Sequence, residues 1–401
     1  MLVQFSFKNF LSFKEETVLD MSAISAYKEH EYNLLSLDTT KERFLKVAAV
    51  YGANASGKSN LIFAYDFFKS IVKDSSNNIA SDEETAISEW YNPFSLCEDN
   101  ANTEFELVEI IDNFEYKYGF EYNEEQIESE WLYKKNLTTH RTVTIFERDA
   151  DCRIVFGGSV RKECDLFREQ VGYESLVLSF YNRLKLETTV FKDVYDAIVN
   201  RLVLDSDFGS DMDMLKKLLP LLLKSKPDKE KFVRFLHAVD TGIQDIRCLP
   251  GEKKIHLYTV HLGKDGHNYE LPLSNESEGT LKCITLYIFM DIAIRKGQCL
   301  LIDELNGKLH PLLLKFLIDL FHEEGSRGQL IYTTHDTTLL DKKFFRRDQI
   351  WFVEKDTYGC SRLYALSDFK VRSDASFEKD YLGGVYGGIP MLKDFEMKEV
   401  K

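Results

Sequence analysis

The pattern of hydrophobic and polar positions near the start of the chain predicts a strand, a glycine turn and a helix in succession. Residues 2–10 (LVQFSFKNF) alternate in the manner of a strand, and residues 46–51 (KVAAVY) form a short apolar run that ends at Gly52. From Lys58 onward, one face of a helix carries a row of apolar residues, namely Leu61, Ile62, Tyr65, Phe68 and Ile71.

In the middle of the chain, the pattern of hydrophobic and polar positions differs from that of the first stretch. Residues 74–90 are polar and acidic, which predicts an exposed loop, and the segments FELVEIID, FEYKYGFEY and RTVTIFERD after it alternate like antiparallel strands. From about residue 190 to 240 the pattern is helical, with Pro220 predicting a kink or a break. Residues 255–273 predict a hairpin that turns between Gly263 and Gly266.

A second α/β stretch runs from about residue 250 to 370. A helical pattern ends near Gly297, and the apolar strand 299–302 follows it. The helical segment 310–321 leads to another short strand that ends at His335. Together the two α/β stretches predict nucleotide-binding sequence near both ends of the chain.

Composition narrows the class of protein. The 401 residues are 44% hydrophobic and 29% charged, which is typical of a soluble globular protein. We expect a cytoplasmic protein without a membrane partner, because no run reaches about 18 apolar residues and the start lacks the apolar core of a secretory signal. The net charge of −15 argues against nonspecific coating of nucleic acid, although a local basic groove would be compatible with it.

The glycine turn has the chemistry of a phosphate-binding loop. Its sequence fits G-x-x-x-x-G-K-[ST] between an apolar strand and a helix, the context that this motif requires. Backbone N–H groups and the helix start would face the phosphates, Lys58 would reach the β- and γ-phosphates, and Ser59 would bind Mg²⁺. The expected nucleotide-binding residues are Gly52, Ala53, Asn54, Ala55, Ser56, Gly57, Lys58, Ser59 and Asn60.

Two acids and a histidine follow apolar strands later in the chain. Asp303 would hold Mg²⁺, Glu304 would polarise the attacking water, and His335 would donate a hydrogen bond to the γ-phosphate. Each feature alone is also typical of a strand that ends in a polar loop. Their order after the phosphate loop favours the catalytic interpretation.

A second anion-binding device precedes the acid pair. The segment SNESEGT stands directly before a helical pattern, and its hydroxyl and N–H groups can bind an anion at the helix start. An ordinary polar helix cap would have the same appearance. Because the chain already has one phosphate loop, we expect Ser277, Glu278, Gly279 and Thr280 to complete the site of another subunit.

With these motifs in order, the chain resembles the ABC-type ATPase family that includes SMC-like and OLD-like proteins. GANASGKSN resembles its Walker A motif, SNESEGT its signature motif, LLIDELNGKLHP its Walker B motif and D-loop, and IYTTHD its H-loop. Stand-alone ATPases of bacterial anti-phage and abortive-infection systems are the most similar, and YLGGVYGGIPML resembles their C-terminal motif. Asn306 stands where many relatives have an acidic D-loop residue, and no Q-loop glutamine is assigned.

The resemblance implies an α/β fold, an ABC-type P-loop NTPase head with an antiparallel β subdomain and a short helical insertion. We expect an N-terminal lobe at 1–75, a β-rich subdomain at 76–190, a helical insertion at 191–250 and a C-terminal lobe at 251–401. The family implies an ATPase that uses ATP and Mg²⁺ and forms a homodimer or a higher homo-oligomer. It also implies an antiviral defence role, in which the ATPase controls a separate effector nuclease encoded nearby.

Two alternatives remain open. The chain could be a nuclease itself, but only residues 336–401 follow His335, and they lack a D-x-D pair. It could instead clamp DNA as SMC-like proteins do, through a basic surface. The candidate basic groups, each also typical of a solvated helix face, are Lys216 with Lys217, Lys224 to Arg234, and Lys342 to Arg347 with Phe344 and Phe345.

Overall fold

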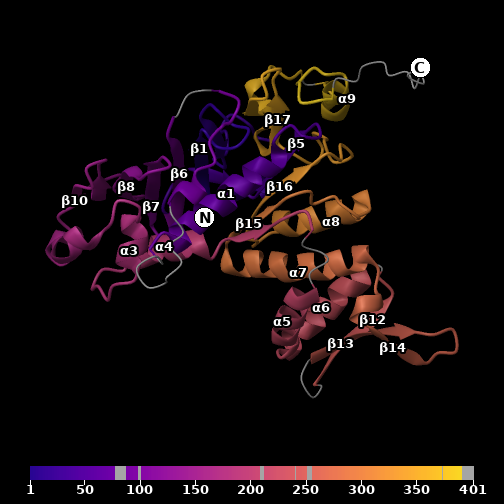
Figure 1. Ribbon diagram of the computed structural model, residues 1–401. Helices are drawn as coiled ribbons and strands as arrows, with labels where there is room; N and C mark the ends of the chain where they lie inside the picture. The colour runs from indigo at the N-terminus through magenta and orange to yellow at the C-terminus, as the bar shows by residue number, and fades with distance from the viewer. Residues whose placement is uncertain are drawn as a thin grey trace, which may run out of the picture.

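Two large sheets dominate the computed structural model, which describes residues 1–76, 87–97, 101–207, 212–239, 241–250, 255–372 and 374–390. Figure 1 shows an antiparallel sheet on one side, a mostly parallel sheet in the middle, and a smaller helical and β part below it. The chain therefore has the α/β architecture that its sequence predicts.

The central sheet has six strands in the order β11-β15-β16-β5-β17-β18. Their bounds are Leu202–Leu204, Cys299–Ile302, Gln329–Thr334, Val47–Gly52, Ile350–Lys355 and Ser361–Ala365. The first five strands are parallel, and only β18 runs antiparallel to its neighbour β17. The carboxyl ends of β5, β15 and β16 therefore meet at one edge of this sheet.

Strand β5 shows why the central sheet is a core layer. All six of its residues are buried, and alternate side chains point to opposite faces. Val47, Ala49 and Tyr51 pack with helices α7 (Glu278–Lys296) and α8 (Pro311–His322), whereas Ala48 and Val50 pack with helix α1 (Lys58–Asp74). Helices on both faces are the usual cover of a parallel sheet.

The antiparallel sheet has seven strands in the order β10-β9-β8-β7-β6-β1-β2. Their bounds are Ile154–Phe156, Thr142–Arg148, Ile127–Asn136, Phe114–Tyr122, Thr103–Ile111, Leu2–Lys8 and Thr17–Asp20. Aromatic side chains join the sheet to α1, and the ring centroids of Phe5 and Tyr65 are 5.0 Å apart. Most of the aromatic residues between 105 and 146 are thus core, whereas Phe114, Trp131 and Tyr133 are half-buried.

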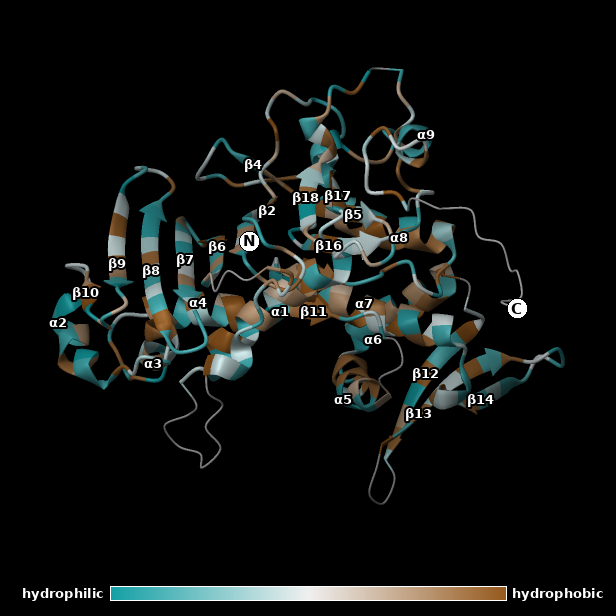
Figure 2. Cartoon of the chain, turned by 45° about the horizontal axis from the view of Figure 1, so that its top comes forward, coloured by the Kyte–Doolittle hydropathy of each residue, from teal (hydrophilic) through white to brown (hydrophobic). Residues whose placement is uncertain are grey.

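A smaller part of the molecule lies beyond α7 (Figure 2). It combines helices α5 (Met212–Leu223) and α6 (Lys226–Ala238) with the antiparallel strands β12 (Ile243–Pro250), β13 (Ile255–Leu262) and β14 (Asn268–Pro272). The hairpin turn between β13 and β14 includes Gly263 and Gly266, which confirms the predicted hairpin. The sequence predicts a kink or a break at Pro220. The expected break is wrong, because α5 continues through the proline, and Leu215, Leu219 and Leu222 of this helix are buried.

The remaining elements connect these layers. They are α2 (Arg161–Cys164), α3 (Val177–Asn182), α4 (Val190–Val199), α9 (Phe377–Leu382), β3 (Leu34–Ser36) and β4 (Arg43–Leu45), with 3₁₀ turns at Glu31–Asn33, Ile87–Trp90, Asp165–Gln170, Leu273–Asn275, Arg347–Gln349 and Leu366–Asp368. Residues 77–86 of the loop expected at 74–90 lie outside the described residues. Ser76 and Ile87, the described residues on either side of this gap, are buried. No helix in the described part of the chain is long and apolar enough to span a membrane.

The four-part division of the chain stays a prediction about units along the sequence. In space the strands cross the expected boundaries. β1 and β2 pair into the sheet of the β-rich range, and β11, from the range expected to be a helical insertion, pairs with β15.

Candidate nucleotide-binding site

The predicted phosphate loop joins the end of β5 to the start of α1. Gly57 is the residue before the first helical one and has φ 113°, a conformation that L side chains rarely adopt. A Cβ at this position would lie 2.5 Å from Ser361 Oγ and 2.9 Å from Ser12 Oγ. Both the backbone angle and the close approach therefore require glycine here.

Two serines from distant parts of the chain support the loop from behind. Ser361 Oγ donates to the Ser56 carbonyl oxygen at 2.6 Å, and its oxygen lies within hydrogen-bond distance of Ser12 Oγ, at 2.9 Å. Asn60 Nδ2 donates to the same Ser12 oxygen at 2.8 Å. Sequence reasoning missed Ser12 and Ser361, because each lies in a segment that has no motif.

Lys58 lies near the acid pair. Its side chain is buried, and Nζ donates to the carbonyl oxygens of Gly52 and Ala53, at 2.9 Å each. Burial lowers the pKa of Lys58, while the negative charges of Glu304 and Asp303 oppose that shift. The ammonium group thus has only neutral acceptors in the loop, and a phosphate would offer it charged ones.

A pocket of about 230 Å³ opens at this loop. Glu304 contributes to its wall, so the structure brings the catalytic candidate to the phosphate loop. The wall residues are Asn54, Ala55, Gly57, Lys58, Ser59, Asn60, Glu304 and Lys355. The sequence did not predict Lys355 in the wall of this pocket. Lys355 lies there because Val353, two residues earlier in β17, pairs with Gly52.

Thr333 holds both acids of the Walker B pair. Its hydroxyl donates to Asp303 Oδ1 at 2.5 Å and accepts the backbone N–H of Glu304 at 2.8 Å. Thr333 is fully buried in β16, the strand beside β15. Sequence reasoning used the neighbouring His335 and missed Thr333, whose role depends on the pairing of the two strands.

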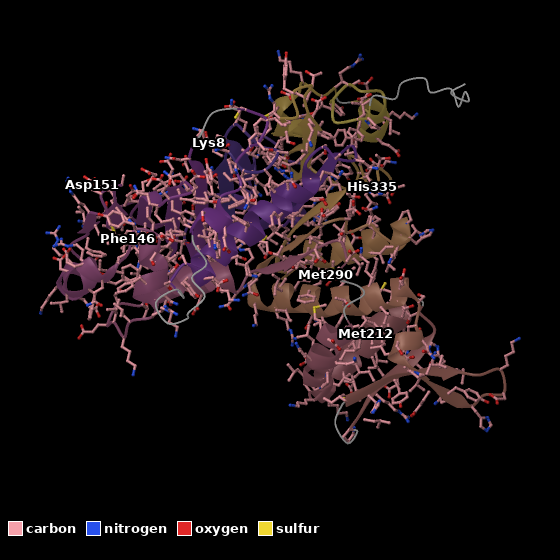
Figure 3. All side chains as sticks on the ribbon, in the orientation of Figure 1. Lys8, Phe146, Asp151, Met212, Met290 and His335 are labelled. Carbon is pink, nitrogen blue, oxygen red and sulfur yellow. The ribbon has the colours of Figure 1, made fainter. Side chains whose placement is uncertain are left out.

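Asn306 connects the D-loop to the H-loop segment. Thr334 Oγ1 donates to Asn306 Oδ1 at 2.8 Å, and Asn306 Nδ2 lies 3.4 Å from His335 Nε2. His335 is exposed just beyond β16 (Figure 3) and does not line the pocket. An amide at position 306 thus contacts the histidine directly, and the catalytic role of His335 remains a proposal.

The signature segment lies outside the phosphate pocket of its own chain. None of the residues Ser277 to Thr280 belongs to the wall of that pocket. Ser277 Oγ accepts the Thr280 N–H at 3.1 Å and caps α7, as an N-cap serine does. Glu278 instead pairs with Lys308 at 2.7 Å, on the segment after the acid pair.

The donor groups fit the expected ligands. Ser59 is exposed to the pocket and supplies a hydroxyl, and Asp303 supplies a carboxylate close enough to influence Lys58. Oxygen donors of this kind suit Mg²⁺, which usually takes one or two protein ligands together with phosphate oxygens. The loop and Lys58 suit the phosphates themselves.

The fold and this site define a P-loop nucleotide-binding protein of the ABC type. The chain belongs to the family described as "AAA domain, putative AbiEii toxin, Type IV TA system", whose model matches residues 47–341. That match covers most of the chain and confirms the resemblance that the motifs indicated. It also places the chain in an ATPase family.

Solved SMC head domains are distant relatives in structure. The SMC head domain from Thermotoga maritima has 13% identity and a TM-score of 0.40, over 91% of this chain and 98% of that chain. An Smc head domain with a coiled coil and joint from Pyrococcus yayanosii has 12% identity and a TM-score of 0.44, over 96% and 99%. A search of curated proteins found no match.

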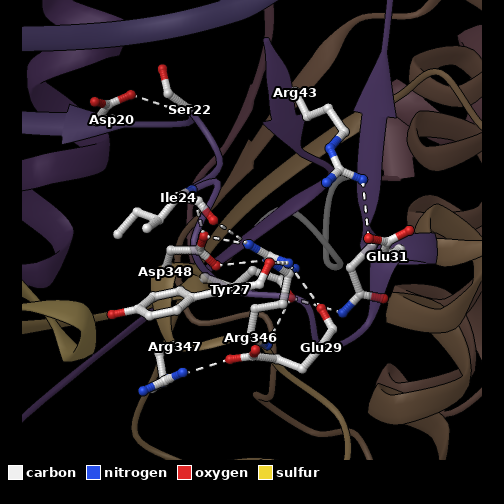
Figure 4. A network of polar contacts seen from close by, with 12 residues as sticks. Asp20, Ser22, Ile24, Tyr27, Glu29, Glu31, Arg43, Arg346, Arg347 and Asp348 are labelled. Carbon is white, nitrogen blue, oxygen red and sulfur yellow. Dashed lines mark hydrogen bonds and ion pairs between the residues drawn. The ribbon is translucent and has the colours of Figure 1, made fainter. Parts of the chain in front are cut away.

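The basic groups considered for DNA contact have other partners. Arg346 is fully buried, and its guanidinium group donates to the Asp348 carboxylate and to backbone oxygens of residues 24, 27 and 29 (Figure 4). Arg347 pairs with Glu29 at 3.2 Å. Arg346 and Arg347 thus join two segments of the chain and do not form a free basic surface, whereas Lys342 and Lys343 of the same group are exposed.

The other basic candidates are largely balanced by acids, as pairs such as Lys216 with Asp213 and Lys231 with Asp291 show. For the nuclease alternative, the described residues gather no group of three or more His, Cys, Asp or Glu side chains that could hold a metal ion. No observation in the described part of the chain specifically favours a DNA clamp or a nuclease.

Proposed function

We propose that this chain hydrolyses ATP as a switch whose composite sites form when two copies meet. One observation carries the proposal. Glu304 and Lys58 share a pocket, whereas Ser277 to Thr280, which can bind an anion at a helix start, lie outside it. A second copy would bring its own Ser277 helix to the open side of the pocket and enclose the nucleotide.

The chain's own residues account for the chemistry of hydrolysis. Lys58 and the backbone N–H groups of the loop bind the phosphates, and Ser59 and Asp303 would hold Mg²⁺, which neutralises charge on the phosphate oxygens. Glu304 would take a proton from the attacking water, a role supported by its position in the wall of the same pocket as Lys58. His335 would donate a hydrogen bond to the γ-phosphate once the sites close.

The first test separates binding from hydrolysis. In Glu304→Gln the amide keeps the shape of the side chain and loses its basicity, so ATP should bind with unchanged affinity while turnover falls at least 100-fold. The trapped ATP state should elute as a larger species from a sizing column. Turnover near that of the unchanged protein would remove Glu304 from its assigned role.

The second test asks whether Ser277 and Gly279 act across a subunit boundary. Gly279→Asp places a carboxylate where a γ-phosphate should lie, and it should abolish hydrolysis and ATP-dependent association. A Cβ here would lie 3.1 Å from the Lys308 carbonyl oxygen, so Gly279→Ala is the control for the added atom alone. The alanine variant should keep most of the activity.

Mixing then distinguishes a composite site from a site within one chain. Gly279→Asp and Lys58→Ala are each inactive alone, but each mixed dimer regains one site made of Lys58 from one chain and Gly279 from the other. Activity should return toward half that of the unchanged dimer. A mixed dimer that forms and stays inactive would contradict the composite site.

We further propose that the switch is the sensor ATPase of a bacterial anti-phage defence system and controls a separate effector nuclease. The family description, with its toxin of a type IV toxin–antitoxin system, supports a place in such systems. The test is to express the chain with the product of the neighbouring open reading frame during phage challenge. Protection should require both proteins and should be lost with Glu304→Gln. Protection by either protein alone would contradict the two-component arrangement.

A further inference from the structure

A buried lysine joins the signature helix to the segment that carries the catalytic acid. Lys282 is on α7, one turn beyond the Ser277 cap, and is 3% exposed. Its Nζ donates to the backbone carbonyl oxygen of Glu304 at 3.1 Å. Glu304 and Lys282 also share the wall of a second cavity, of about 150 Å³, which is separate from the phosphate pocket.

The backbone of Glu304 needs such support. Its φ is 48°, in the left-handed region, which is strained for a residue with a side chain. Thr333 binds the N–H of Glu304, and Lys282 binds its carbonyl oxygen. The peptide groups on both sides of this residue are thus fixed by side chains from β16 and from α7.

The segment after Glu304 leaves room for the lysine. Position 307 is a glycine, and a Cβ there would lie 3.2 Å from Lys282 Nζ. The Gly307 N–H also donates to the Glu304 carbonyl oxygen, at 3.1 Å, so this oxygen closes a tight turn as well as accepting from the lysine. A larger residue at 307 would press on the ammonium group.

The same segment contacts the first turn of α7. Lys308 pairs with Glu278 at 2.7 Å, and the Lys308 carbonyl oxygen lies within 3.1 Å of a Cβ placed on Gly279. The start of the signature helix and residues 304–308 are therefore packed together in one chain.

The buried position also affects the charge of Lys282. Burial lowers the pKa of Lys282 to about 8, and the negative charge of Glu304 opposes this shift. The lysine therefore keeps its charge at neutral pH.

We propose that Lys282 is a positioning residue that holds Glu304 of its own chain in the orientation that activates water. This role rests on the proposed hydrolysis and adds a physical link from Ser277 to Glu304 within one subunit. The Ser277 helix start would contact the nucleotide of one composite site, while Glu304 of the same chain serves the other site. Lys282 thus connects the two sites of a dimer.

The test replaces the lysine by an apolar side chain of similar length. Lys282→Met removes a charged donor from a buried acceptor. The loss of one such hydrogen bond predicts a fall in kcat of about 10-fold to 100-fold. KM for ATP and ATP-dependent association should stay unchanged, because neither the phosphate loop nor the helix cap is altered. Lys296→Met, at the exposed end of the same helix, is the control and should keep full activity.

Two further variants separate positioning from folding. Lys282→Gln keeps a neutral donor, and Lys282→Arg keeps a charged one, so kcat should fall in the order Lys, Arg, Gln, Met while KM stays constant. If the Lys282→Met protein does not fold, the order of kcat can still be measured with the Lys282→Arg and Lys282→Gln proteins. Equal kcat for folded Lys and Gln proteins would overturn the proposal.

Mixed dimers show on which chain Lys282 acts. When the partner carries Lys58→Ala, only one site turns over, and it uses Glu304 of the other chain. Lys282→Met on the chain that supplies Glu304 should lower the remaining activity by the same factor of about 10-fold to 100-fold, whereas Lys282→Met on the Lys58→Ala chain should leave it unchanged. The reverse result would overturn the assignment to Glu304 of the same chain. If Glu304→Gln itself turns over normally, the proposed hydrolysis fails instead.

Discussion

Replacing Thr333 by valine tests whether one buried hydroxyl positions both acids of the site. The change keeps the branched shape and removes a donor to Asp303 and an acceptor for the Glu304 N–H. Loss of a hydrogen bond to a charged group costs about 1.5–3 kcal/mol, and a buried N–H left without a partner costs about 1–3 kcal/mol. We expect the unfolding free energy to fall by about 2.5–6 kcal/mol and kcat to fall at least tenfold, while ATP affinity changes little.

The structure supplies a matched control for this substitution. Thr285, on α7, is also fully buried, but its hydroxyl has no partner within the described residues. Thr285→Val should therefore leave activity unchanged and keep or raise stability. Urea unfolding and steady-state hydrolysis of both variants are the measurements. The positioning role of Thr333 would be refuted if the two valine variants lost the same amount of kcat.

Three other substitutions give separable outcomes. Lys58→Ala should abolish measurable ATP binding in calorimetry, because the phosphates lose their only buried cation in the pocket wall. Gly57→Ala should weaken ATP binding at least tenfold, since its Cβ would collide with Ser361, whereas Gly266→Ala, at φ 79° in open space, should leave binding unchanged. Burial lowers the pKa of His322 to about 3, so the folded protein excludes a proton that the unfolded chain takes up below pH 6.5. Stability is therefore lost as pH falls, and between pH 7 and pH 5 the unchanged protein should lose about 2 kcal/mol more than His322→Phe in urea unfolding.

The elements that the sequence predicts well are those set by local chemistry. The strand, glycine turn and helix around Lys58 follow from an apolar run and a motif whose structural context is a strand, a glycine-rich turn and a helix. The helix that begins after Ser277 and ends at Gly297 has a serine cap and a left-handed glycine, both readable in the sequence. The strands that precede Asp303 and His335 could be located along the chain because motif and strand coincide, but their pairing is seen only in the structure.

The parts that sequence reasoning missed depend on contacts between distant segments. Ser12 and Ser361 are 349 residues apart and meet only because β18 lies beside the phosphate loop. Lys355 reaches the pocket through the register of β17 with β5, which no local pattern encodes. Pro220 shows the opposite error: local chemistry predicts a kink or a break, but α5 continues through the proline, and Leu215, Leu219 and Leu222 of this helix are buried.

The strained backbone of the site explains why its acids need so many supports. Ala55, Glu304 and Lys308 all have positive φ, and they lie in the phosphate loop and in the segment after the acid pair. Such conformations persist only where the surroundings fix them, and they concentrate at functional sites. Here the fixing groups come from different elements: Thr333 from β16 and Lys282 from α7. A movement of α7 would therefore release the support that Lys282 gives to Glu304. If the proposed composite site forms, contact of a second nucleotide with Ser277 would alter the geometry of the acid without any change in the phosphate loop.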